Sequence, residues 1–200
     1  MKNLGFAAVA LCAAAGAAHA IDITAESIGS GEYTSRADAA VYSHLTGSYS
    51  AFDSANYLGF DDYTTTLSPG QSTASLTSMK FVGGVTTANT SLRFNFYDAA
   101  GTTLVNSFDI AFGQSGNFIW TISGMGGFNI ASKGVMEVVG VGNATGKWFL
   151  SQSATTVGGD DRSFGDNTAA FQHSFELSVP APGSLALLGL GGMIAGRRRR

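Results

Sequence analysis

The sequence predicts an all-β domain, an antiparallel sandwich with a jelly-roll-like form. Apolar residues in the middle of the chain alternate with polar ones at a period of two, no segment shows an amphipathic helical pattern, and glycine-rich breaks recur between short segments. Two sheets of such strands bury alternate residues between them. We expect eight aromatic side chains to fill this interior: Phe94, Phe96, Phe108, Phe112, Trp120, Trp148, Phe171 and Phe175.

The clearest pair of strands is a hairpin. Residues 91–97 and 104–112 both alternate, and Asp98-Ala99-Ala100-Gly101 lies between them. Asp at the start and Gly at the end favour a type I turn followed by a left-handed residue. We expect further strands at 41–45, 76–85, 117–122, 135–141, 147–151 and 171–179, separated by glycine-rich breaks at 113–116, 124–127, 140–146 and 158–165.

The first 20 residues have the features of a secretory signal peptide. Lys2 precedes an apolar run at 6–18, and Ala18-His19-Ala20 fits the small-x-small site of signal peptidase. We therefore expect a signal helix at 1–20, engagement of the secretion machinery and cleavage after Ala20. The only cysteine, Cys12, is lost with this segment, so the mature chain has no disulfide.

The C-terminal end predicts a short membrane anchor. Pro180-Ala181-Pro182 is followed by a mostly apolar stretch at 183–196 and then by Arg197, Arg198, Arg199 and Arg200. As a helix at about 1.5 Å per residue, this stretch spans roughly 21 Å, against about 30 Å of hydrocarbon. The terminal arginines stay in the cytoplasm by the positive-inside rule, so the preceding domain is held beyond the inner membrane.

This tail resembles the PEP-CTERM sorting signal of Gram-negative bacteria that make exopolysaccharide. The resemblance covers 180–200 in the order of its parts, and Ala181 stands where the family has Glu. It implies that an exosortase-like membrane enzyme cuts near the Pro180–Pro182 region. The protein is then anchored in the inner membrane at least transiently and is passed to the cell surface or the extracellular matrix.

The passenger between the two signals, 21–179, has a length suited to a single domain. It contains six basic and 14 acidic residues, a net charge of −8. This balance argues against nucleic acid or an anionic membrane surface as the partner of the passenger, since both carry negative charge themselves.

Two adjacent acidic pairs are the main candidate site residues. Asp61-Asp62 and Asp160-Asp161 invite comparison with glycosidases, but neighbouring residues in an extended strand point to opposite faces, whereas glycosidase carboxylates face one substrate. The loop at 158–167 offers Asp160, Asp161 and Asp166 as weak calcium ligands. It lacks the EF-hand order, and a solvated turn is the alternative interpretation.

No catalytic or cofactor-binding set is predicted. His44 and His173 lie far apart without a zinc motif, so packed or hydrogen-bonded structural roles are expected for both. The leading hypothesis is therefore a non-enzymatic exported domain. The alternatives are a carbohydrate-binding module, with calcium as a possible aid and extracellular polysaccharide as partner, and a hydrolase that uses Asp61, Asp160 or His44.

Overall fold

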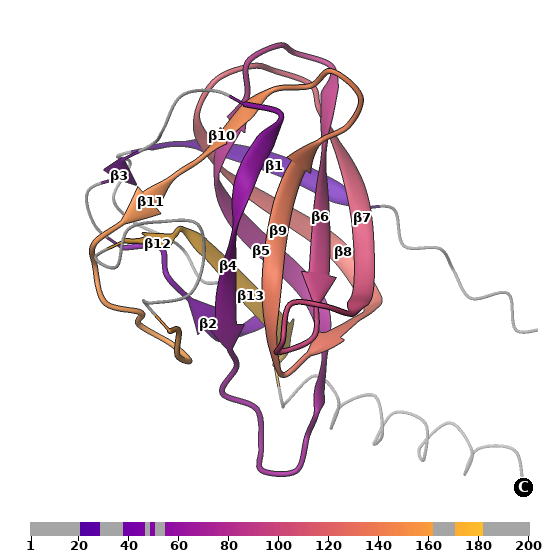
Figure 1. Ribbon diagram of the computed structural model, residues 1–200, viewed down its shortest axis with the longest axis vertical. Helices are drawn as coiled ribbons and strands as arrows, with labels where there is room; N and C mark the ends of the chain where they lie inside the picture. The colour runs from indigo at the N-terminus through magenta and orange to yellow at the C-terminus, as the bar shows by residue number, and fades with distance from the viewer. Residues whose placement is uncertain (1–20, 29–37, 47–48, 51–54, 162–170, 182–200) are drawn as a thin grey trace, which may run out of the picture.

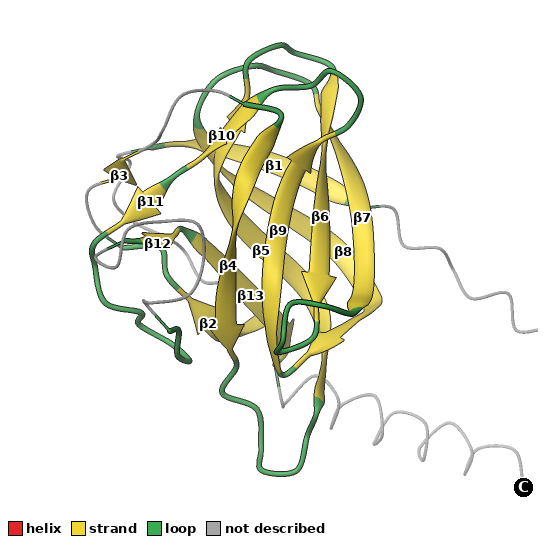
Figure 2. Cartoon of the chain, in the orientation of Figure 1, coloured by secondary structure: helices red, strands yellow, loops and turns green. Residues whose placement is uncertain are grey.

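A computed structural model describes residues 21–28, 38–46, 49–50, 55–161 and 171–181. None of these residues is helical, and every pairing of strands among them is antiparallel. The prediction of an all-β fold is confirmed. Two larger sheets pack face to face, and a small third sheet lies beside them (Figures 1 and 2). The predicted signal helix and the predicted C-terminal membrane helix lie outside the described residues.

The first sheet has the strand order β1-β8-β5-β13-β2, and β10 also pairs with β5. Its two longest strands, β5 and β8, form the centre of the sheet, and the C-terminal strand β13 lies between β5 and β2. The strands are β1 (Asp22–Ser27), β2 (Asp38–Ser43), β5 (Thr73–Val85), β8 (Phe118–Ala131), β10 (Gly146–Trp148) and β13 (Phe175–Pro180).

The second sheet has the order β4-β9-β6-β7 and contains the predicted hairpin. Its strands are β4 (Tyr57–Thr64), β6 (Thr90–Tyr97), β7 (Leu104–Phe112) and β9 (Lys133–Gly140). In the turn that joins β6 to β7, Gly101 donates to the Asp98 carbonyl at 2.9 Å and has a left-handed φ of 68°. The expected turn chemistry is thus confirmed, because glycine takes the position that needs positive φ.

The small sheet has the order β12-β11-β3, with β3 (Tyr49–Ser50), β11 (Leu150–Ser151) and β12 (Gln172–His173). It divides two segments that were predicted as single strands. The segment at 147–151 becomes β10 and β11, and the segment at 171–179 becomes β12 and β13. Ser174 separates β12 from β13, and its backbone N–H donates to the carbonyl of Phe149 rather than to a ladder of the first sheet.

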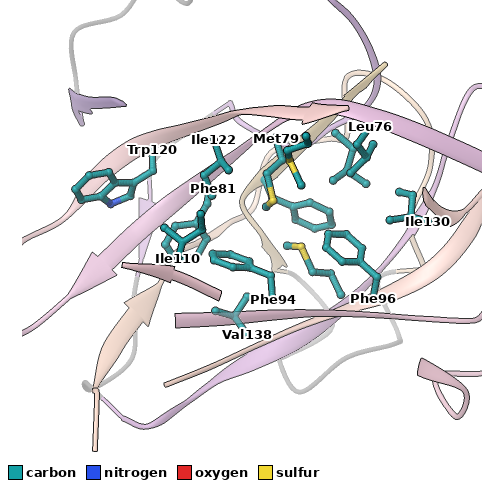
Figure 3. Packing of buried hydrophobic residues seen from close by; sticks show 14 of the residues in the cluster. Leu76, Met79, Phe81, Phe94, Phe96, Ile110, Trp120, Ile122, Ile130 and Val138 are labelled. Carbon is teal, nitrogen blue, oxygen red and sulfur yellow. The ribbon is translucent and has the colours of Figure 1, made fainter. Parts of the chain in front are cut away.

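The core lies between the two larger sheets (Figure 3). Phe81 from the first sheet meets Phe94 from the second edge to face, with ring centroids 5.3 Å apart. Six of the eight predicted aromatic residues are buried, and Phe108 is partly buried against them. The expectation for Phe171 is wrong, because this residue precedes the small sheet and is only half-buried.

The glycine-rich segment at 124–127 was expected to end a strand, and this expectation is also wrong. Strand β8 continues through it, and Gly124 and Gly127 have φ values of 78° and 85°. The segment forms a bulge, since Leu76 of β5 pairs with Phe128 whereas Ser78 pairs with Ser123. Positive φ lets glycine absorb the extra residues without ending the strand.

Candidate functional site

The structure brings together both acidic pairs and both histidines that the sequence singled out. Asp61 and Asp62 lie in β4, His173 lies in β12, and His44 directly follows β2. Two isolated bridges outside the named ladders dock the loop that carries the second acidic pair. One joins Thr64 to Gly159 and the other joins Ser43 to Val157. We call the group of His44, Asp61, Asp62, Asp160 and Asp161 the acid cluster.

Asp61 is the most deeply placed carboxylate of the acid cluster, with no exposed surface. Its Oδ2 accepts a hydrogen bond from the backbone N–H of His173 at 2.6 Å, and its Oδ1 accepts one from that of Asp62 at 3.0 Å. Burial raises the pKa of the Asp61 carboxyl well above its usual value, and the neighbouring charge of Asp62 raises it further. Asp61 therefore holds β12 against β4.

Asp62 makes an equivalent contact with the loop. Both of its oxygens accept from the backbone N–H of Asp161, at 2.9 and 3.1 Å. Burial raises the pKa of the Asp62 carboxyl, and the charge of Asp160 adds to this effect. Asp61 pairs with Met136 and Asp62 with Val135, so the two carboxylates leave β4 on opposite faces, as expected for neighbours in a strand.

His44 contacts the same loop through Thr155. The His44 Nδ1 lies 3.4 Å from the Thr155 hydroxyl and 3.9 Å from Asp160 Oδ2, and the Thr155 hydroxyl donates to the Asp160 carboxylate. The His44 side chain is fully buried and that of Asp160 is 9 % exposed. Tyr42 packs nearby, where burial and then the charge of Asp61 raise the pKa of its phenol. The His44 and Asp160 side chains on this side of the acid cluster are therefore both largely shielded from solvent.

His173 has the packed role that its register predicted. Its ring stacks on Trp148 with centroids 4.0 Å apart and an interplanar angle of 23°. The Trp148 indole N–H donates to the carbonyl of Ser174 at 3.3 Å. Both histidines are thus buried.

The hydrogen bonds of the acid cluster are structural in kind. Its two most buried carboxylates accept backbone N–H groups from β4, β12 and the loop after Gly159. Within the described stretches, no group of three or more His, Cys, Asp or Glu side chains is arranged to hold a metal ion. Asp160 and Asp161 of the calcium prediction are described, whereas Asp166 lies outside the described residues.

The sorting residues begin inside the folded domain. Pro180 is the last residue of β13, and Ala181 follows it directly. Ser178 pairs with Ser78 of β5 and with Ala40 of β2, and Pro180 pairs with Asp38 of β2. The remaining predicted processing residues, Ala20, Pro182 and Arg197 to Arg200, lie outside the described residues.

A family model for the PEP-CTERM protein-sorting motif matches residues 178–200. The chain carries a PEP-CTERM sorting motif. The matched segment starts at Ser178, so the motif and strand β13 share Ser178, Val179 and Pro180. The motif indicates export with a membrane-associated C-terminal signal and processing by exosortase-type machinery. No curated protein and no solved structure matches the chain. In the described part of the chain, no helix has the length and apolar character needed to cross a membrane.

Sequence reasoning missed a pocket of about 300 Å³ on the outer face of the second sheet. We call it the sheet-face pocket; it is lined by Tyr57, Phe60, Tyr97, Ala100, Gly101, Val135 and Glu137. One part of this pocket could have been predicted from the sequence. Tyr97 lies on the polar side of the alternation at 91–97, opposite the buried phenylalanines. The contribution of Tyr57 and Phe60 could not be predicted, because the strand that carries them, β4, was not expected from the sequence.

Proposed function

We propose that this protein is an exported, non-enzymatic β-sandwich domain that its PEP-CTERM motif delivers through the inner membrane to the cell surface or the extracellular matrix. The observation that carries the proposal is the match of the sorting motif to residues 178–200. The acidic character of the passenger fits a soluble domain outside the cell that does not bind nucleic acid.

The junction between the domain and the motif supports delivery of a folded passenger. Strand β13 runs between β5 and β2 and continues to Pro180, the first residue of the Pro-Ala-Pro sequence. An enzyme that cuts on the N-terminal side of Ser178 would remove half of this central strand. Processing beyond Pro180 leaves all of the β13 pairings in place. The proposed cut therefore lies C-terminal to Pro180.

The environment of the acid cluster supports a non-enzymatic role. A general acid or base must reach its substrate, either directly or through one water molecule. Asp61 has no exposed surface, and both of its oxygens accept hydrogen bonds from the backbone. Asp62 likewise accepts from the backbone of Asp161 with both oxygens. These contacts favour fold stabilisation over the hydrolase alternative.

Cell fractionation tests the proposal, with the passenger detected by an antibody raised against it. The test variant replaces both Pro180 and Pro182 with alanine, and the control variant is Arg93→Ala, which changes an exposed residue outside the motif. We expect the control to reach the surface or medium in processed form and the test variant to accumulate unprocessed in the inner membrane. A wild-type protein that stays in the cytoplasm with residues 1–20 attached would contradict the proposal.

A further inference from the structure

The sheet-face pocket has features of a binding site that the acid cluster lacks. It lies on the outer face of the second sheet and opens away from the core. Tyr57 is 46 % exposed, and Phe60 and Tyr97 are half-buried. The volume of about 300 Å³ is at the lower end of the range for small-molecule sites. Three aromatic rings with one carboxylate, that of Glu137, match the usual make-up of such sites.

The register of the strands explains why these side chains share a face. Phe60 pairs with Glu137, Tyr97 pairs with Val135, and Tyr57 pairs with Val139. Residues 135, 137 and 139 alternate with the core residues Met136 and Val138, so they and their partners point outward. Five of the seven lining residues therefore come from three neighbouring strands, β4, β9 and β6, and the turn between β6 and β7 supplies the other two.

Glu137 is held in place by two donors. Its Oε2 accepts from Asn95 Nδ2 at 2.8 Å and from the Tyr97 hydroxyl at 3.0 Å. Oε1 accepts no hydrogen bond from the described residues and remains for a ligand hydroxyl. A carboxylate that is oriented before binding loses little freedom when the ligand arrives.

The two ends of the pocket are also fixed. Asn56, next to Tyr57, donates through Nδ2 to the carbonyls of Gly140, Gly142 and Ala144 at 3.1, 3.1 and 2.7 Å. At the other end, Asp98 Oδ1 accepts from the backbone of Thr102 and Thr103 and so shapes the turn that carries Ala100 and Gly101. These bonds fix the chain at both ends of the pocket without help from a ligand.

From this geometry we propose that the sheet-face pocket binds a neutral glycan chain. Sugar rings present apolar C–H faces that stack on aromatic side chains, together with hydroxyls that donate to a carboxylate. Among the described residues, the lining contains Glu137 and no lysine or arginine, and the passenger carries a net charge of −8. Both features disfavour uronic acids and phosphates. The inference deepens the proposed function, since it gives the exported domain a ligand class.

Isothermal titration calorimetry tests the proposal on the full chain in a detergent without a sugar headgroup. The probes are neutral oligosaccharides, namely β-1,4-, β-1,3- and α-1,4-glucans and a β-1,4-mannan, with alginate and oligogalacturonate as acidic comparisons. We expect at least one neutral probe to bind with a Kd of about 1 mM or tighter, which is typical of weak but specific contacts. The acidic probes should not bind.

Three variants locate the binding. Tyr57→Ala should weaken it about tenfold, since it removes an exposed stacking surface. Glu137→Gln should weaken it about fivefold, because a neutral acceptor replaces a charged one. Tyr97→Phe keeps the ring, loses the bond to Glu137, and should weaken binding about threefold. Val105→Ala, an exposed change on edge strand β7 outside the pocket, is the control and should bind as the wild type does.

Several results would overturn the proposal. The first is that no neutral probe binds at up to about 5 mM. The second is that only the acidic probes bind. The third is that both Tyr57→Ala and Glu137→Gln bind the neutral probe with unchanged affinity. Self-association in analytical ultracentrifugation that Tyr57→Ala abolishes would show that a second copy of the chain occupies the face. Sorting is measured separately by fractionation, so a failure of glycan binding is distinguishable from a failure of export.

Discussion

Replacing Asp61 with alanine tests whether the acid cluster stabilises the fold. The change leaves two backbone N–H groups, those of His173 and Asp62, without their carboxylate acceptor. Each unsatisfied buried donor costs about 1 to 3 kcal/mol. We therefore expect the free energy of unfolding to fall by about 2 to 6 kcal/mol under conditions that protonate the carboxyl.

The cost should depend on pH in a defined direction. The pKa of Asp61 is raised in the folded state above its usual value of 3.8. Its favourable contribution is therefore complete below the unfolded pKa and is lost as pH rises through the folded pKa. Wild-type stability should decline above about pH 4 for this reason, with a parallel contribution from Asp62, whose pKa is also raised. The penalty of Asp61→Ala should then be largest at acid pH and smaller near pH 8.

Urea denaturation between pH 4 and 8 measures this effect, with fluorescence of the buried Trp120 and Trp148 as the signal. Asp109→Ala is a control whose penalty should stay constant over this pH range. The hydrogen bond from Arg93 lowers the pKa of the Asp109 carboxyl from its usual value of 3.8, so the contribution of Asp109 is complete above about pH 4 and is lost only at lower pH. A penalty for Asp61→Ala that is the same at every pH, or that grows toward pH 8, would refute the reasoning.

Three further changes test the fold and its junction with the sorting motif. Phe96→Ala should cost about 3 to 5 kcal/mol in urea denaturation, because Phe96 is fully buried among aromatic rings. Gly140→Ala should lower the thermal midpoint, since a Cβ there lies 1.9 Å from the carbonyl oxygen of Ala144; an unchanged midpoint would contradict this close approach. Truncation after Leu177 should abolish folding, as judged by circular dichroism, whereas truncation after Ala181 should preserve it, because only the first removes part of β13.

Local patterns in the sequence predicted the parts of the fold that depend on neighbouring residues. The hairpin of β6 and β7 follows from alternation and from turn residues such as Gly101. Strand β4 was missed because it places two charged residues, Asp61 and Asp62, at buried positions. Aspartate is rarely buried and is depleted in strands, so propensity argued against this segment. Hydrogen bonds across the fold make the burial tolerable.

The contacts of the candidate sites were beyond sequence reasoning for a different reason. The donor to Asp61 is the backbone of His173, which lies 112 residues away, and the donor to Asp62 lies 99 residues away. Every residue except proline has a backbone N–H, so the residue type does not reveal which N–H will donate to a distant carboxylate. The sheet-face pocket likewise depends on the order β4-β9-β6, which brings Phe60, Glu137 and Tyr97 together. Only the sorting motif could be recognised completely from the sequence, because its residues form one contiguous segment.

The mass of the mature protein, with sequencing of both of its ends, tests the central claim most directly. The account predicts a chain that begins at Ile21 and ends beyond Pro180 without the arginine tail, so that β13 is intact. A mature protein that retains all 200 residues, or one that ends before Ser178, would contradict it.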